Sequence, residues 1–154
     1  MSTLHEVPKE YLKFPNVETQ MPSYGDKEAV GCDFYSKETV TIEPRKQHLF
    51  FTDVCATFSP SLGLFLQVRS SIGIKKGLTL ANGLGVIESS YYANESNYGN
   101  LGICLFNNSD VPVTIEVGER IAQGFLLPVM RFENAIQSDT IRTGGFGSTN
   151  KEGK

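Results

Sequence analysis

The sequence predicts an all-β protein, a sandwich or barrel built as a single domain. Many short segments rich in β-branched and aromatic residues follow one another at short spacing. The glycines and prolines are spread along the chain, and no long stretch has the periodicity of an amphipathic helix. The chain has 154 residues without an internal repeat or a linker, so we expect one domain.

The first expected strands lie in the amino-terminal half of the chain. Residues 39–42 alternate threonine with valine and isoleucine and stop at Glu43 and Pro44. Residues 49–58 are rich in phenylalanine, valine and threonine and predict another strand. Residues 64–68 form a mostly apolar run that begins after a glycine, which indicates a buried strand.

The remaining expected strands lie in the carboxy-terminal half. Residues 101–106 form a strand-like run that ends at a polar, turn-like segment. The alternation that follows places Val113, Ile115 and Val117 on one face of a strand. A turn containing glycine then leads into the last expected strand, residues 120–127.

The two ends of the chain differ in composition from its middle. Residues 1–22 carry several charges and prolines, and we expect them to be a loosely held amino-terminal arm of a β-barrel domain spanning residues 1–135. From residue 136 the chain becomes polar and then rich in glycine. Residues 136–154 are therefore expected to form a flexible carboxy-terminal arm.

Charge and hydropathy exclude several classes of protein. The formal net charge of −3 is a poor match for the phosphate backbone, so we expect no nucleic-acid partner. No apolar run approaches the ~18 residues that a membrane helix needs, so we expect no membrane partner. Residues 1–10 lack the apolar centre of a secretory signal, which favours a cytoplasmic location.

The cysteines and histidines argue against metal clusters and disulfides. Cys32, Cys55 and Cys104 are odd in number, far apart and outside any C-x-x-C pair, which is typical of reduced cytosolic thiols. His5 and His48 are isolated, which excludes most histidine-based triads and zinc sites.

Two stretches in the middle of the chain could carry chemistry. At residues 69–73 an apolar strand ends in an arginine and two serines, which could bind an anion, although a solvated turn has the same composition. In residues 81–91, Gly83 and Gly85 allow close backbone approach. Glu88 directly follows two apolar residues, where partial desolvation would raise the pKa of a carboxylate and suit it to act as a general base. An exposed glutamate at the start of a hairpin is the simpler alternative.

Two further stretches lie towards the carboxyl end. Gln123 alternates with apolar residues and could donate its amide to a ligand or to a neighbouring backbone group. Arg120 is better explained as an ion-pair partner than as a catalytic group. Residues 142–149 combine glycines, Phe146, an arginine and two hydroxyls, as a phosphate-gripping flap with a stacking ring would. A flexible linker is the alternative, and Phe146 counts against it.

Taken together and in this order, the four stretches resemble the motifs of the trimeric dUTP diphosphatase (dUTPase) family. Residues 29–35, Ala-Val-Gly-Cys-Asp-Phe-Tyr, resemble that family's first motif. The likeness covers residues 29–149. Five motifs in the right order, with strand-like segments between them, make it specific.

The resemblance implies a jelly-roll-like β-barrel or sandwich that forms a homotrimer. Each active site would lie at a subunit boundary, with the carboxy-terminal arm exchanged between subunits to close over it. The implied reaction is the Mg²⁺-dependent hydrolysis of dUTP to dUMP and pyrophosphate, by water attack on the α-phosphate.

The resemblance also implies roles for individual residues. Asp33 would hold Mg²⁺ through its water shell, and Glu88 would be the catalytic residue that orients the attacking water. Tyr91 would pack under the deoxyribose and exclude a 2′-hydroxyl. The hairpin from Gly85 to Gly102 would read uracil with backbone groups. The implied phosphate-binding residues are Arg69, Ser70, Ser71 and Gln123, with Arg142, Gly147, Ser148 and Thr149 from the arm, whose Phe146 would stack on uracil.

The chain departs from the family pattern at several positions. Glu88 stands where the family has aspartate, and Ser90 replaces a second acidic residue. Residues 92–101 are longer than the usual hairpin, and we expect a surface insertion there that could bind a regulatory protein partner. The insertion leaves Tyr98 as an alternative to Tyr91. The last motif is also one residue shorter after Arg142.

Two other functions remain open at this stage. One is a dCTP deaminase of the same superfamily, because that branch also uses a glutamate near this hairpin. The other is a nucleotide-binding regulatory protein with weak turnover, since some phage dUTPases act as switches. The glycine-rich tail favours dUTP hydrolysis over both.

Overall fold

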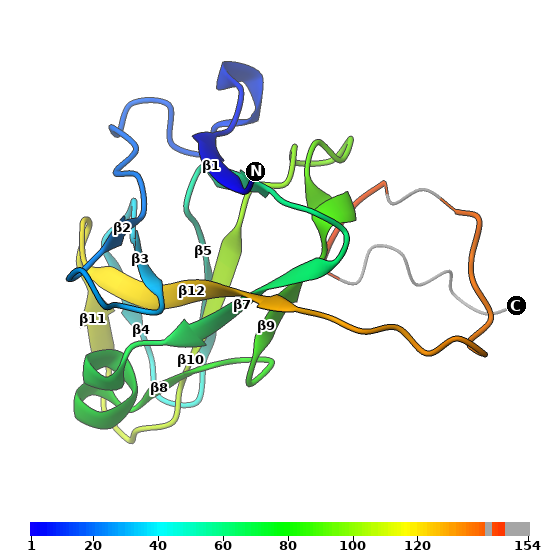
Figure 1. Cartoon of the computed structure of the whole chain (residues 1–154). Coiled ribbons are helices and arrows are strands. Elements are labelled where there is room, and N and C mark those ends of the chain that lie inside the picture. The colour runs from blue at the N-terminus through cyan, green and yellow to red at the C-terminus, as the bar shows by residue number, and fades with distance from the viewer. Residues whose placement is uncertain (141–142, 147–154) are drawn as a thin grey trace, which may run out of the picture.

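The computed structural model describes residues 1–140 and 143–146, and its described part is an all-β, jelly-roll-like barrel (Figure 1). The predicted fold class is confirmed. The strands are β1 (Thr3–Glu6), β2 (Ser23–Tyr24), β3 (Cys32–Tyr35), β4 (Val40–Ile42), β5 (Gln47–Phe51), β6 (Val54–Thr57), β7 (Leu62–Val68), β8 (Leu78–Leu80), β9 (Gly85–Ile87), β10 (Gly102–Asn107), β11 (Val113–Ile115) and β12 (Arg120–Pro128). The helical turns are η1 (Lys9–Tyr11), η2 (Ser71–Lys75) and η3 (Ser89–Tyr91).

All the strand pairs of the described residues are antiparallel. The largest sheet has the order β2-β3-β12-β7-β9, and a second sheet has the order β5-β10-β8. Two smaller sheets pair β1 with β6 and β4 with β11. In the largest sheet Gln123 lies opposite Asp33 on one side and opposite Gln67 on the other. Three polar residues therefore cross the middle of this sheet in register.

The hydrophobic core lies between the two larger sheets. Phe34 and Ile121 come from the five-stranded sheet, Phe50 and Leu105 from the three-stranded sheet, and all four are completely buried in one cluster. Full burial of one such side chain stabilises the fold by about 1.5–3 kcal/mol. The core thus fixes both sheets and with them the loops at their edges.

Two expectations about the strands were wrong in detail. Residues 49–58 form two strands, β5 and β6, because the chain turns sharply at Asp53, which has a φ of +57° and is completely buried. The strand around Val113 ends at Ile115. Val117 therefore lies in the following turn and is 54% exposed, although the alternation placed it in the strand on the same face as Val113 and Ile115.

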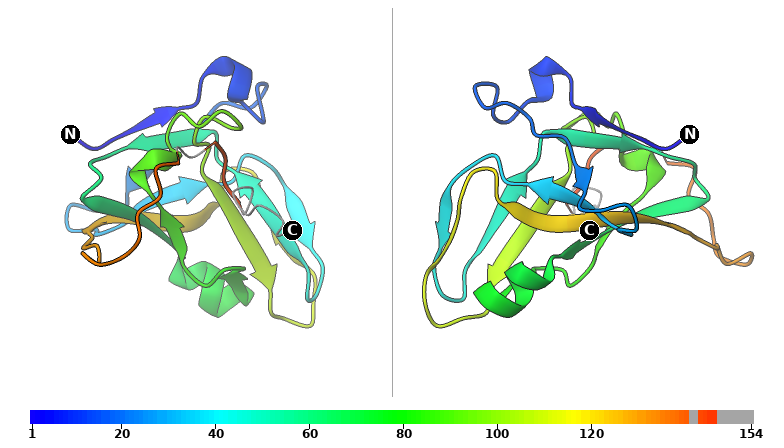
Figure 2. Two further views of the ribbon diagram at one scale, coloured as in Figure 1. Left: turned by 90° about the vertical axis from the view of Figure 1, so that its right-hand side faces the viewer. Right: turned by 60° about the vertical axis from the view of Figure 1, so that its left-hand side comes forward.

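The amino-terminal arm is tied to the barrel instead of being loosely held. Strand β1 pairs with β6 along its whole length, as two views show (Figure 2). Further along, the Asp53 carboxylate accepts hydrogen bonds from the backbone N–H groups of Lys13 at 2.8 Å and Phe14 at 3.0 Å. No pattern in the sequence predicts this tether, because it joins segments about 40 residues apart through one buried side chain.

The three cysteines are free thiols. Cys32 and Cys55 are buried and Cys104 is partly buried, and burial raises the pKa of each thiol. In the described part of the chain, no helix has the length and apolar character needed to span a lipid bilayer.

Candidate active site

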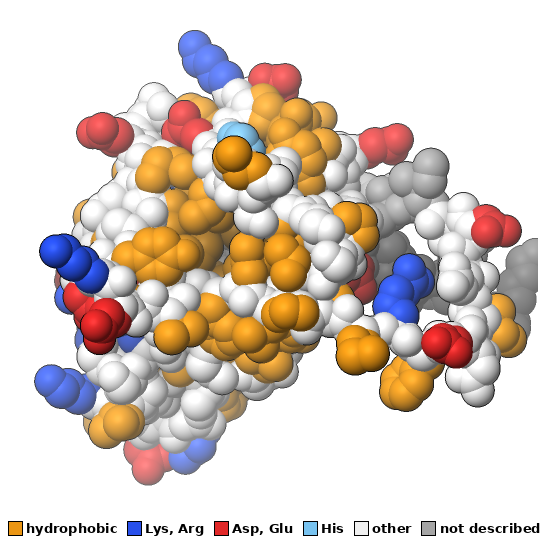
Figure 3. Space-filling view, in the orientation of Figure 1, with side chains coloured by type: hydrophobic (Ala, Val, Ile, Leu, Met, Phe, Trp, Pro, Cys, Tyr) orange, Lys and Arg blue, Asp and Glu red, His pale blue; other side chains and the backbone are white. Residues whose placement is uncertain are grey.

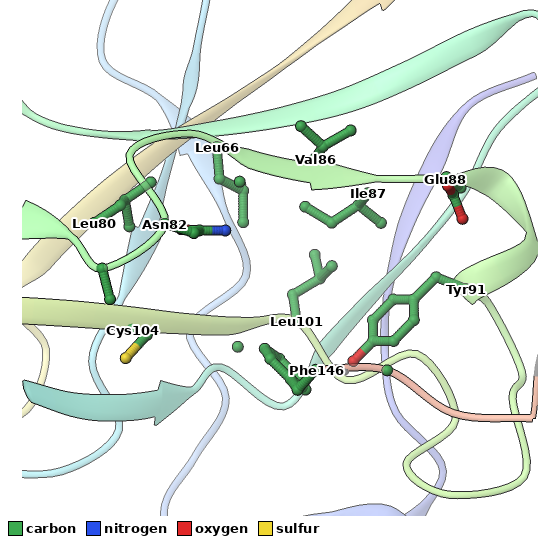
Figure 4. Close-up of a pocket in the computed structure, with 14 residues that line it drawn as sticks. Leu66, Leu80, Asn82, Val86, Ile87, Glu88, Tyr91, Leu101, Cys104 and Phe146 are labelled. Atoms are coloured by element: carbon green, nitrogen blue, oxygen red, sulfur yellow. The ribbon is translucent and has the colours of Figure 1, made fainter. Parts of the chain in front are cut away.

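A pocket of about 360 Å³ opens between β9, β10 and η3 (Figure 4). It brings together five residues that the sequence singled out from two different motifs, namely Gly85, Glu88, Tyr91, Gly102 and Phe146. The rest of the wall is mostly apolar. It consists of Leu66, Leu80, Ala81, Asn82, Val86, Ile87, Leu101, Cys104 and Gly145.

The pocket exists because β9 and β10 do not pair with each other. Strand β9 pairs with β7 at the edge of the five-stranded sheet, whereas β10 lies between β5 and β8. The expected hairpin from Gly85 to Gly102 is thus a segment that leaves one sheet and enters the other. An edge strand presents backbone N–H and C=O groups to its surroundings, and β9 borders the pocket.

Glu88 and Tyr91 are held by the helical turn η3. Glu88 occupies the position before this turn, and its backbone carbonyl accepts the Tyr91 N–H at 3.0 Å. Glu88 is an exposed residue that lines the end of the pocket. Tyr91 is only 7% exposed, and its ring forms part of the wall.

The structure distinguishes between the two tyrosines that the sequence left open. Tyr91 lines the pocket. Tyr98 lies outside it, with its ring 5.2 Å from the ring of Tyr11 and 5.5 Å from that of Tyr92, measured between centroids. Tyr98 therefore joins the insertion to the amino-terminal arm.

The described part of the glycine-rich motif covers the pocket of its own chain. The Phe146 ring packs edge-to-face on Phe51 and Tyr91, with centroid distances of 5.8 and 6.3 Å. It also lies against Gly102, where an added Cβ would come within 2.5 Å of the ring. The other residues predicted from this motif lie outside the described residues, namely Arg142, Gly147, Ser148 and Thr149.

A second, charged cluster surrounds Asp33 on β3. Asp33 is 5% exposed, and its carboxylate pairs with Arg69 Nε at 3.1 Å and with Arg120 at 3.4 Å. The prediction that Arg120 is an ion-pair partner is confirmed. Ser70 and Ser71 are exposed at the start of η2, directly after Arg69. This cluster and Gln123, which lies opposite Asp33 on β12, contribute nothing to the lining of the pocket.

The geometry limits how a metal ion could be held. Both oxygens of Asp33 face guanidinium groups, which does not fit a direct metal ligand. No three His, Cys, Asp or Glu side chains gather into a metal site within the ranges that the structure describes. An ion that keeps most of its waters and binds substrate phosphates, as Mg²⁺ does, needs no such cage.

The insertion contains buried asparagines that the sequence analysis placed on the surface. Asn94, Asn97 and Asn100 are 3%, 7% and 0% exposed. They are buried because they hydrogen-bond to one another and to Tyr91 and Asp53. The only signal in the sequence was three asparagines at a spacing of three residues, which is equally typical of solvated turns.

Comparisons with known proteins support the motif assignment. The family model described as dUTPase matches residues 17–150. A deoxyuridine 5′-triphosphate nucleotidohydrolase of Lactococcus lactis is 36% identical over 138 residues, covering 89% of this chain and 92% of that protein. One from Nautilia profundicola is 35% identical over 144 residues, covering 91% of this chain and 97% of that protein.

Solved structures show the same fold. A dUTPase from Streptococcus mutans superposes with a TM-score of 0.75 at 30% identity, over 85% of this chain and 98% of that one. A mutant of the dUTPase from phage phi11 of S. aureus, which coordinates a structural Mg(II) ion, has a TM-score of 0.69 at 22% identity. That alignment covers 91% of this chain and 97% of that one and supports the fold alone.

Proposed function

Because the chain belongs to the dUTPase family, whose model spans residues 17–150, we propose that it hydrolyses dUTP to dUMP and pyrophosphate. The observation that carries this proposal is the pocket, which unites the glycine-rich motif with the hairpin motif. Its volume of about 360 Å³ lies within the range of small-molecule sites.

We propose that uracil enters between β9 and β10. Uracil offers one N–H donor flanked by two carbonyl acceptors, which complements the alternating C=O and N–H groups of a strand edge. Strand β9 supplies such an edge from Gly85 to Ile87. Phe146 lies across Gly102 and provides the face on which the base would stack.

Tyr91 is proposed to pack under the deoxyribose, and Glu88 to orient the attacking water. Glu88 lies three residues before Tyr91 and at the same end of the pocket, so its carboxylate can face the phosphate side of a bound nucleotide. Glu88 is exposed, so solvent water can reach it.

The phosphate-binding groups are proposed to come from another subunit of a homotrimer. Arg69, Ser70, Ser71 and Gln123 do not line the pocket of their own chain, which supports their delivery by a second chain. Asp33 orients Arg69 through a 3.1 Å ion pair. Arg142, Gly147, Ser148 and Thr149 would complete the grip on the triphosphate.

Exposed apolar side chains support assembly into a trimer. Leu126 and Leu127 are exposed on β12, and Met130, Phe132 and Ile136 are 84–102% exposed on the segment that follows it. Figure 3 shows apolar side chains on the face over β12 and along this segment. Such patches mark protein–protein contacts, and we propose that they pack between subunits. Phe146 of the arm lies on the pocket of its own chain, so the expected exchange of the arm between subunits is not part of this proposal.

We propose that the reaction uses Mg²⁺ bound mainly by water and the triphosphate. When bound, the ion supplies neutralisation of the phosphate charge. Asp33 would touch only its water shell. The chain's own residues supply positioning and hydrogen-bond donors, which suffice for phosphoryl chemistry without a covalent nucleophile.

Pyrophosphate release from dUTP with Mg²⁺ tests the proposal, with dTTP, dCTP and UTP measured in parallel. We expect hydrolysis of dUTP alone, and we expect Glu88→Gln to abolish it while calorimetry still detects nucleotide binding. Glu95→Gln, the same change at an exposed glutamate of the insertion, is the matched control and should keep its rate. Tight binding without turnover would instead indicate a regulatory protein, and ammonia release from dCTP a deaminase.

A further inference from the structure

The orientation of the Tyr91 ring is set by hydrogen bonds from the insertion. The Tyr91 hydroxyl donates to the backbone carbonyl of Asn100 at 3.0 Å. It accepts a hydrogen bond from Asn97 Nδ2 at 2.7 Å. Donor and acceptor therefore hold the far end of the ring from two sides, while η3 holds its Cα.

The direction of the Asn97 amide is determined by its other partners. Asn97 Oδ1 accepts the backbone N–H of Gly99 at 3.0 Å and Asn94 Nδ2 at 2.7 Å. Because both of these groups can only donate, the oxygen must face them and the NH₂ group must face Tyr91. Asn97 is 7% exposed, so water does not compete freely for these bonds.

The loop backbone is shaped to bring these groups back to Tyr91. Gly99 has a φ of +81°, and an added Cβ would lie 2.8 Å from the Tyr91 carbonyl oxygen, so glycine is required there. Asn100 is anchored in turn, since its Nδ2 donates to Asp53 Oδ1 at 2.8 Å and its Oδ1 accepts the Asp53 N–H at 3.0 Å. The acceptor for the Tyr91 hydroxyl is thus fixed to the barrel.

We propose that Asn97 is a positioning residue that sets the discrimination between deoxyribose and ribose by immobilising Tyr91. The inference rests on the proposed function of the pocket. A ring that cannot withdraw rejects a sugar with one additional oxygen, whereas a ring released from its hydrogen bonds can yield. Asn97 touches no substrate and acts only through Tyr91.

The test compares kcat/KM for dUTP and UTP in Asn97→Leu and Asn97→Ala. Both variants lose the N–H donor to Tyr91, and neither places a new acceptor next to the Tyr91 hydroxyl. We expect the preference for dUTP to fall about three- to tenfold, the range that one hydrogen bond supports. The change should come mainly from a better kcat/KM for UTP, with kcat for dUTP nearly unchanged.

A double-mutant cycle separates positioning from a general loss of structure. Tyr91→Phe removes the same hydrogen bond from its other end, so we expect Asn97→Leu to change the preference little further in that background. Asn107→Leu is the matched control. Asn107 is completely buried and donates to the carbonyls of Ile42 and Val111, so this change should lower stability without altering the sugar preference.

The outcomes distinguish this inference from the proposed function. A wild-type chain that hydrolyses no dUTP would overturn the proposed function and the inference with it. A wild-type chain that prefers dUTP, with variants that keep the full preference, would overturn the inference alone. Additive effects in the cycle, or an equal loss for both nucleotides, would assign Asn97 a purely structural role and also refute the inference.

Discussion

Replacement of Lys37 by methionine should destabilise the fold strongly, because Lys37 is half of a buried ion pair. Its ammonium lies 2.9 Å from Asp53 Oδ2, and the two side chains are 3% and 0% exposed. Removing one partner of such a pair leaves an uncompensated charge and generally costs about 3–5 kcal/mol. Methionine has nearly the length of lysine and leaves little cavity.

The structure places the expected loss near the lower end of that range. Asp53 keeps three N–H donors after the change, from the backbone of Lys13 and Phe14 and from Asn100 Nδ2. These continue to stabilise the carboxylate, so we expect the free energy of unfolding to fall by about 3 kcal/mol. The hydrogen bond from Lys37 to Thr19 Oγ1, at 2.7 Å, is lost as well.

Urea unfolding at fixed protein concentration, followed by far-ultraviolet circular dichroism because the chain has no tryptophan, measures the loss. Arg45→Met is the control, since Arg45 pairs with Asp110 at 2.8 Å but the two side chains are 60% and 89% exposed. Its effect should be small. A loss for Lys37→Met below about 1 kcal/mol, or equal to that of the control, would refute the reasoning about burial.

Three further predictions follow from the same geometry. Burial alone would raise the pKa of Asp53, but hydrogen bonds from Lys13, Lys37, Asn100 and Phe14 hold that pKa below its ordinary value. The stability that the Asp53 carboxylate contributes is therefore complete above about pH 4 and is lost as the pH falls through its folded-state pKa. Between about pH 6 and 3, the urea midpoint of Asp53→Asn should drop less than that of the unaltered chain. Deletion of residues 142–154 should lower pyrophosphate release more than tenfold with an unchanged urea midpoint, and a change of oligomeric state in light scattering would contradict this. Asp33→Asn should lower kcat/KM for dUTP about tenfold or more by releasing Arg69, whereas an unchanged value would show that Arg69 needs no orientation.

The strands that the sequence predicted well are those with a clear hydrophobic pattern. β7, β10 and β12 pack into the core, and their runs of apolar residues show it. The two-residue strand β2 and the three-residue strand β8 are too short for any period to appear. The division of residues 49–58 into two strands was missed because it depends on a distant segment. Asp53 turns the chain in a left-handed conformation, and its carboxylate accepts a hydrogen bond from the backbone of the amino-terminal arm.

The motifs predicted the pocket residues but not the groups that hold them. Gly85, Glu88 and Phe146 could be named from their chemistry and their neighbours in the sequence, and Tyr91 from the resemblance to the family's motif. Asn97 could not, because asparagine in a polar run looks the same whether it faces water or a tyrosine. Burial of a polar residue depends on partners that only the folded chain brings together.

The tether at Asp53 tolerates drift in the sequence of the amino-terminal arm. Lys13 and Phe14 offer Asp53 their backbone N–H groups and not their side chains. Every amino acid except proline carries that donor. The two hydrogen bonds to Asp53 therefore depend on the carboxylate at position 53 and not on which side chains stand at positions 13 and 14, although Lys13 Nζ also lies 5.2 Å from the centre of the Phe51 ring.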